Sequence, residues 1–94
     1  MSWETIDSVH GAAKGYVLPL ESCNLVFITK GNSVLGCGAL DVAALDRLQV
    51  PAARISGVAS VQDLLDGVVK EVNAGAAGRG VQVGDSGRDA LDKL

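Results

Sequence analysis

The chain has 94 residues, of which 48% are hydrophobic, but only one Phe, one Trp and one Tyr. This length suits a single domain spanning residues 1–94, whose core must be built from Val, Leu, Ile and Ala. The formal net charge of −3 is spread along the chain, which argues against nucleic acid and anionic membranes as partners, because both call for a basic surface. Neither a transmembrane run nor a signal-peptide pattern is found, so we expect a cytoplasmic protein.

An apolar composition in a small domain predicts self-association, because some apolar surface is expected to remain for copies of the chain. We therefore expect a homo-oligomer. Cys23 and Cys37 are not expected to face one another, and a reducing compartment would keep both as free thiols. His10 is the only histidine and falls in a predicted turn, so no zinc spacing exists within one chain, and neither a metal nor a cofactor is expected. A metal site shared between subunits stays open.

The amino-terminal third predicts two strands. Residues 3–9 alternate loosely and predict a first strand, which a turn at His10-Gly11 ends. Residues 15–20 predict a second strand. Because Pro19 cannot donate a hydrogen bond to a neighbouring strand, this segment is predicted to be an edge strand or a strand end.

The stretch from Asn24 to Asp41 carries a strong hairpin signal. Gly31-Asn32 between two apolar runs predicts a type II′ turn, in which the glycine adopts a positive φ. The resulting register places four side chains on one face: Val26, Ile28, Leu35 and Cys37. Gly36 and Gly38 lie on the opposite face and leave room for another element, most often a helix of the same fold.

Asp41 is a suitable N-cap for a helix that begins at Val42 and whose apolar positions are Ala44, Leu45 and Leu48. Residues 52–57 follow as a strand. A strand, a helix and a strand in succession are typical of a crossover unit.

Ser60 and Asp63 resemble a capping box and begin the clearest helical pattern in the chain. Apolar residues recur at helical spacing from there to Ala76: Val61, Leu64, Leu65, Val68, Val69, Val72 and Ala76. Gly67 lies inside this pattern and disfavours helix, so the sequence does not decide whether the helix breaks there.

Residues 81–83 predict a short strand, residues 84–87 a turn, and Ser86 the N-cap of a last helix that runs to the carboxyl end. Together the elements predict an α+β fold. Its largely antiparallel sheet is built on the central hairpin, and helices pack on it.

Three segments carry a resemblance to a known family: GCGALDVAALD, then ARISGV with LLD behind it, and VGDSGRDAL. Together they resemble the YunC-like family (domain of unknown function 1805) over nearly the whole chain from the first hairpin onward. The resemblance implies a small bacterial and archaeal α+β domain without an established biochemical role. The matching positions are Cys37, Gly38, Asp41, Arg54, Gly57, Gly84, Gly87 and Arg88. The glycine-rich segment Ala74 to Gly80 departs from the family and leaves the length of the second helix open.

Cys37 is the sharpest candidate for chemistry. The amino terminus of a helix favours the thiolate, which is the nucleophilic form of cysteine. Asp41 caps the same terminus, however, and its negative charge opposes that effect. We favour the interpretation that Cys37 is a small buried residue beside Val26 and Leu35, and keep Cys37 with Asp41 as the catalytic candidates.

The segment Gly84 to Arg88 is a candidate anion site. A turn feeds a helix there, so free amides near Ser86 and Gly87 and the guanidinium of Arg88 can meet an anion. In the plainer interpretation, Ser86 only caps the helix and Arg88 pairs with a surface carboxylate.

Arg54 lies within a predicted strand, where an arginine usually has a partner. Asp41 is one candidate partner, which would form a structural ion pair. Alternatively, Arg54, Arg88 and Cys37 converge on a pocket at a subunit boundary.

Two classes of function remain open. The favoured one is a non-catalytic homo-oligomeric module that binds a small anionic ligand or a protein partner. The alternative is a thiol-dependent enzyme with Cys37 as nucleophile and with Asp41, Arg54 or Arg88 orienting the substrate. Nucleotide binding is disfavoured, because residues 36–41 read G-x-G-x-x-D and lack the third glycine of a dinucleotide fingerprint.

Overall fold

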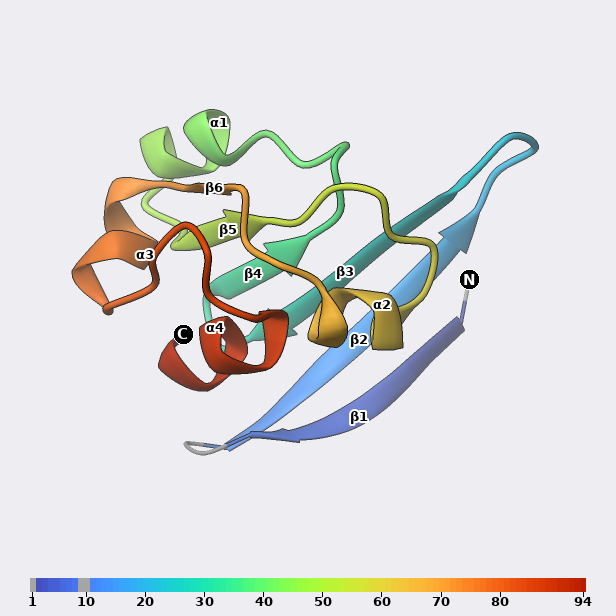
Figure 1. The fold of residues 1–94 in the computed structure, drawn as a ribbon, viewed down its shortest axis with the longest axis horizontal. Helices are drawn as coiled ribbons and strands as arrows, with labels where there is room; N and C mark the ends of the chain where they lie inside the picture. The colour runs from blue at the N-terminus through green and yellow to red at the C-terminus, as the bar shows by residue number, and fades with distance from the viewer. Residues whose placement is uncertain (1, 9–10) are drawn as a thin grey trace.

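The computed structural model describes residues 2–8 and 11–94, and six strands form one sheet in the order β1-β2-β3-β4-β5-β6 (Figure 1). Neighbouring strands are antiparallel except for β4 and β5, which are parallel. The predicted α+β fold with a largely antiparallel sheet is confirmed. The elements are β1 (Ser2–Ser8), β2 (Gly11–Pro19), β3 (Asn24–Lys30), β4 (Ser33–Gly36), α1 (Val42–Arg47), β5 (Ala52–Arg54), α2 (Val61–Asp66), β6 (Glu71–Val72), α3 (Ala74–Gly78) and α4 (Gly87–Lys93).

The β3–β4 hairpin has the predicted register, since Ile28 pairs with Leu35 and Lys30 with Ser33. Gly31 has a φ of +59°, whereas Gln49 is the one described non-glycine residue with a positive φ. A positive φ at the first central position alone is the mark of a type II′ turn, so the predicted turn is confirmed.

Strand β2 begins at Gly11, earlier than predicted, and lies between β1 and β3. The edge-strand alternative is therefore wrong. Pro19 is the last residue of β2, so the strand-end alternative is confirmed. The structure tolerates this proline because the strand pairing ends there. The turn residue His10 lies outside the described residues.

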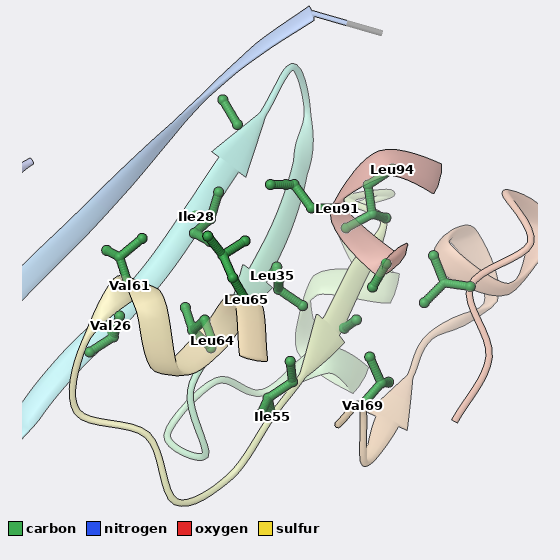
Figure 2. Close-up of a cluster of buried hydrophobic side chains, with 14 of the residues drawn as sticks. Val26, Ile28, Leu35, Ile55, Val61, Leu64, Leu65, Val69, Leu91 and Leu94 are labelled. Carbon is green, nitrogen blue, oxygen red and sulfur yellow. The ribbon is translucent and has the colours of Figure 1, made fainter. Parts of the chain in front are cut away.

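One face of the sheet carries the main core (Figure 2). Helix α2 packs against β2 and β3, and α4 packs against β4 and α2. Gly15 lets α2 approach the sheet, because a Cβ at that position would lie 2.8 Å from Cγ2 of Val61. The cluster consists of aliphatic side chains and one thiol: Ile6, Ala13, Val26, Ile28, Leu35, Cys37, Ala53, Ile55, Val61, Leu64, Leu65, Val69, Ala76, Val81, Ala90, Leu91 and Leu94.

Helix α1 joins the parallel strands β4 and β5 and packs beside β5, which confirms the crossover unit. Val42 and Ala52 are buried but lie outside the main core cluster. Since Ala52 pairs with Val34, these residues belong to the opposite face of the sheet. Leu48 was predicted to pack with this helix, but it is exposed because the helix ends at Arg47.

The helical pattern from Val61 to Ala76 does not form one helix. Helix α2 ends at Asp66 with Gly67 as its C-cap, so the break that the sequence left open at Gly67 does occur. The following residues leave helical geometry and form β6, which pairs with β5. This pairing outweighs the helical spacing of the apolar residues, because Lys70 donates its amide to the Arg54 carbonyl at 2.8 Å. Residues 81–83, predicted as a strand, pair with no described strand.

Candidate functional site

Cys37 follows β4 and is held by the main chain of its neighbours. Its amide donates to the Val26 carbonyl at 3.0 Å, and its carbonyl accepts from the Leu40 amide at 3.0 Å. The residue is 8% exposed and belongs to the main core, as the packing interpretation predicted. A small apolar pocket of about 110 Å³ beside it is lined by Leu25, Val26, Phe27, Cys37, Ala39 and Leu40. Its thiol therefore meets apolar side chains.

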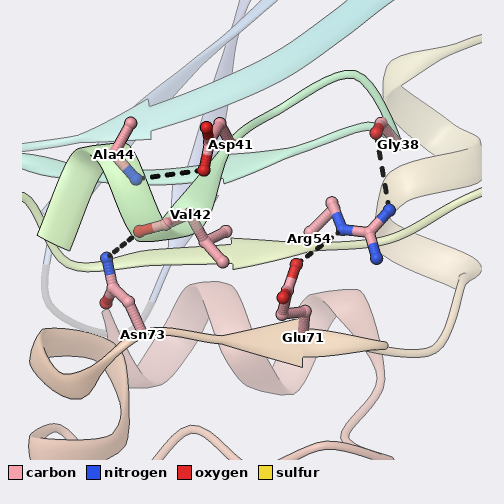
Figure 3. A network of polar contacts seen from close by, with 7 residues as sticks. All are labelled: Gly38, Asp41, Val42, Ala44, Arg54, Glu71 and Asn73. Carbon is pink, nitrogen blue, oxygen red and sulfur yellow. Dashed lines mark hydrogen bonds and ion pairs between the residues drawn. The ribbon is translucent and has the colours of Figure 1, made fainter.

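Asp41 and Arg54 hold separate parts of the structure together (Figure 3). The Asp41 carboxylate accepts a hydrogen bond from the Ala44 amide at 3.0 Å, so it is the predicted N-cap of α1. Arg54 Nε lies 3.0 Å from Glu71 Oε1, and its Nη1 donates to the Gly38 carbonyl at 3.4 Å. The predicted Arg54–Asp41 pair is wrong, because β6 brings Glu71 directly opposite Arg54.

The segment from Gly84 to Arg88 has its polar groups engaged within the chain. Ser86 Oγ accepts from the Asp89 amide at 3.1 Å, which confirms the predicted cap. The Gly87 amide donates to the Gly67 carbonyl at 2.9 Å. Arg88 Nη1 donates to the Asp7 carbonyl at 2.8 Å, and so binds the main chain rather than the predicted carboxylate. Anion binding at this segment remains a prediction.

Gly87 is required for packing. A Cβ at this position would overlap the carbonyl group of Leu64, so the start of α4 lies directly against α2. In the preceding turn, the hydrogen bond from Lys93 lowers the pKa of Asp85, and the amide of Gln82 adds to the effect. The contact of Gly87 with α2 and the hydrogen bonds of Asp85 both show that residues 84–88 serve to fix α4 on the rest of the fold.

Within one chain, Arg54, Arg88 and Cys37 do not converge on a single pocket, and the alternative in which they meet at a subunit boundary remains a prediction. The cross-strand pairs place Cys37 level with Ser2 of β1. Arg88 contacts Asp7, five residues farther along β1, which is roughly 16 Å at about 3.3 Å per residue. Of the two arginines, only Arg54 lies near Cys37, because it donates a hydrogen bond to the carbonyl of the next residue, Gly38.

A row of side chains crosses the sheet face opposite the main core. Each residue pairs with the next across all six strands: Trp3, Tyr16, Phe27, Gly36, Arg54 and Glu71. Leu40 packs over Gly36, since a Cβ there would lie 2.7 Å from Leu40 Cδ2. The predicted room beside this glycine is therefore filled by a loop side chain and not by a helix.

The first three members of this row are the only Trp, Tyr and Phe of the chain. The Tyr16 and Phe27 rings stack with centroids 4.9 Å apart, and Lys14 Nζ lies 5.2 Å from the Trp3 ring. We define the aromatic face by its outward apolar residues on β1–β3: Trp3, Tyr16, Leu18, Leu25 and Phe27. Sequence alternation places residues on faces, but only the register joins these three strands, so the sequence prediction missed this surface.

No group of three or more His, Cys, Asp or Glu side chains that could hold a metal ion occurs within residues 2–8 and 11–94. The same part of the chain contains no helix that is long and apolar enough to cross a membrane.

These features define an α+β domain in which α2 and α4 cover one face of the sheet, while α1 and the aromatic face lie on the other. The chain belongs to the family described as domain of unknown function DUF1805, whose family model matches residues 36–94. It is 37% identical over 79 residues to the uncharacterized protein YunC of Bacillus subtilis (strain 168), which covers 80% of this chain and 78% of that protein. The predicted family is thus confirmed.

The fold is also found in a crystal structure, that of the protein of unknown function TA1206 from Thermoplasma acidophilum. The TM-score is 0.89 at 26% sequence identity, and the match covers 99% of this chain and 91% of the other. Both relatives are described as uncharacterized or of unknown function, so the comparisons supply a family and a fold but no activity.

Proposed function

We propose that this protein is a non-catalytic homo-oligomeric module, in which the aromatic face joins two copies of the chain. The observation that carries the proposal is the exposure of this face. Trp3 is 61% exposed and Leu18 38%, although both lie on the sheet that holds the core. Exposed apolar patches of this kind mark interaction sites in soluble proteins.

The charges on this face suit a second copy as the partner. Asp7 on β1 and Lys14 on β2 project from the same side of the sheet as the aromatic row. Under a two-fold axis, a face with one cation and one anion can match itself, because Lys14 of each copy can meet Asp7 of the other. Only Trp3 and Leu18 of the five apolar residues are exposed and the other three are half-buried, so we expect a weak association in the micromolar range.

A thiol enzyme receives no support from the geometry, because Cys37 lies in the core and Asp41 caps a helix. The small anionic ligand expected near Ser86, Gly87, Arg88 and Arg54 has no independent support, since these groups already bind within the chain. Both cysteines are unpaired, which supports the proposed location in the reducing cytoplasm.

Sedimentation velocity of the wild type and two charge variants tests the proposal. Leu18→Glu introduces a carboxylate into the aromatic face, and Val83→Glu introduces one at a residue that is 62% exposed on the loop before α4. In a two-fold interface the substitution occurs twice, so Leu18→Glu is expected to weaken dimerisation by about a hundredfold or more. Val83→Glu should dimerise like the wild type.

Both variants are first checked for cooperative thermal unfolding, so that a change in mass is not caused by loss of the fold. A wild type that stays monomeric up to about 500 µM would refute the oligomer, since a micromolar interface is then saturated. Equal dimerisation of Leu18→Glu and wild type would refute the aromatic face as the interface.

A further inference from the structure

A pocket of about 340 Å³ lies on the helix-covered side of the sheet, between the β1–β2 hairpin and the start of α2. Its size is within the range of about 300 to 1,000 Å³ that small-molecule sites occupy. The lining residues come from two distant parts of the chain: Trp3, Glu4, Gly15, Val17, Ser60, Val61 and Gln62. None of them was a predicted site residue.

The pocket exists because α2 covers only part of the hairpin. Val61, the first residue of α2, packs onto Gly15, which has no side chain to hold the helix away. Figure 1 shows the paired strands β1 and β2 extending past this helix. Beyond the contact at Gly15, Glu4 and Val17 are left beside the helix start as the walls of an open hollow.

The lining favours a cation that carries an apolar body. Glu4 is the one charged residue among those that line the pocket, and no ion pair to it is found in the described part of the chain. Gln62 donates one amide N–H to Asp66 at 3.0 Å, and its carbonyl oxygen is an acceptor that a ligand can use. An ammonium group can bind the Glu4 carboxylate and the Gln62 oxygen, whereas the negative charge of Glu4 repels an anion.

Apolar walls complete the site, because Val17 and Val61 provide aliphatic surface. We infer that the pocket binds a small primary amine with an aromatic or aliphatic body, whose ammonium group meets the Glu4 carboxylate. This site lies apart from the aromatic face, although Trp3 borders both, and it goes beyond the proposed function.

The single tryptophan gives a direct measurement, because all indole fluorescence of the protein comes from Trp3. Phenethylamine is titrated as the probe, with 3-phenylpropanoate as the matched anion and 2-phenylethanol as the neutral analogue. A saturable change in emission is expected for the amine. Glu4→Gln should weaken amine binding by about tenfold or more, since a charge-assisted contact is lost. Glu71→Gln, which removes a carboxylate from the opposite sheet edge, should bind like the wild type.

The titration is repeated with Leu18→Glu, so that amine binding is measured independently of dimerisation. An unchanged affinity in Glu4→Gln would show that the carboxylate has no role and would overturn the inference. Equally tight binding of the anion or the alcohol would do the same, because either result reduces the pocket to a hydrophobic surface. Failure of the amine to bind, with dimerisation of the wild type intact, refutes this site alone.

Discussion

Cys37 carries the most reactive type of side chain among the candidate residues, but it is buried, so reagents do not easily reach it. Its main chain is fixed between Val26 and Leu40, and its side chain faces the core. Asp41 is close in sequence, yet its carboxylate is used to cap α1. At the scale of single residues, the structure thus uses a thiol and a carboxylate as packing and capping groups.

The second cysteine makes this interpretation testable within one molecule. Cys23 is exposed, whereas Cys37 is buried. With iodoacetamide at neutral pH, Cys23 should react like a free thiol in solution. Cys37 should react at least about a hundredfold more slowly than Cys23, because its reaction requires opening of the core. Peptide mass spectrometry after timed quenching measures both rates.

In about 6 M guanidinium chloride the two cysteines should react at equal rates, which is the control for intrinsic reactivity. A native rate of Cys37 equal to that of Cys23 would contradict the buried, inert thiol and reopen thiol chemistry at this position.

At the scale of elements, sequence reasoning succeeded where structure is decided locally. The β3–β4 hairpin follows from Gly31-Asn32 and alternating apolar residues, and the caps at Asp41, Ser60 and Ser86 follow from single side chains. These signals act over a few residues, so tertiary contacts have little opportunity to change them.

The sequence predictions were wrong where the structure of a segment depends on pairing with a strand that is distant in the sequence. Val69 and Val72 repeat at helical spacing, but Val72 enters β6 and pairs with Ala53 of β5. The partner of Arg54 was missed for the same reason, because Glu71 reaches it only through β6. The aromatic face and the pocket at Glu4 also depend on cross-strand register, which a single sequence does not determine across three strands.

Asn73 is the polar residue on which the arrangement of these elements depends most. It is buried, its Oδ1 accepts from the amides of Ala52 and Ala76 at 3.0 Å each, and its Nδ2 donates to the carbonyls of Val42 at 3.1 Å and Val50 at 2.8 Å. One side chain thus connects α1, β5 and α3, and the contact with Val42 is seen in Figure 3.

Replacing Asn73 with Ala is expected to lower the free energy of unfolding by about 2 to 4 kcal/mol, because buried backbone groups lose their partners. Asn24→Ala is the matched control. That side chain makes one exposed hydrogen bond, to the Ala59 carbonyl at 3.0 Å, so its loss should cost about 1 kcal/mol or less. Urea unfolding at an unchanged m-value gives both numbers, and equal costs for the two variants would show that Asn73 is not special.

At the scale of the whole molecule, the family match and the fold have different boundaries. The family model matches residues 36–94, which begin at the last residue of β4. The core, however, is shared between the two parts of the chain, because α2 packs on β2 and β3. Ile6, Ala13, Val26 and Ile28 in the first part face Val61, Leu64 and Leu65 in the second.

Residues 36–94 expressed alone are therefore expected not to fold. The fragment lacks β1–β3 and all of β4 except Gly36, so β5 loses its parallel partner, and α2 and α4 lose the sheet surface that their apolar side chains cover. A chain of about 60 residues is marginally stable even with a complete core, so the loss of half of it leaves too little buried apolar area. Amide proton–nitrogen NMR spectra should show narrow dispersion for the fragment and wide dispersion for the full chain. A dispersed spectrum with cooperative unfolding of the fragment would show instead that β5, β6 and the four helices form an independent unit, and that strands β1–β4 with the aromatic face are an addition to it.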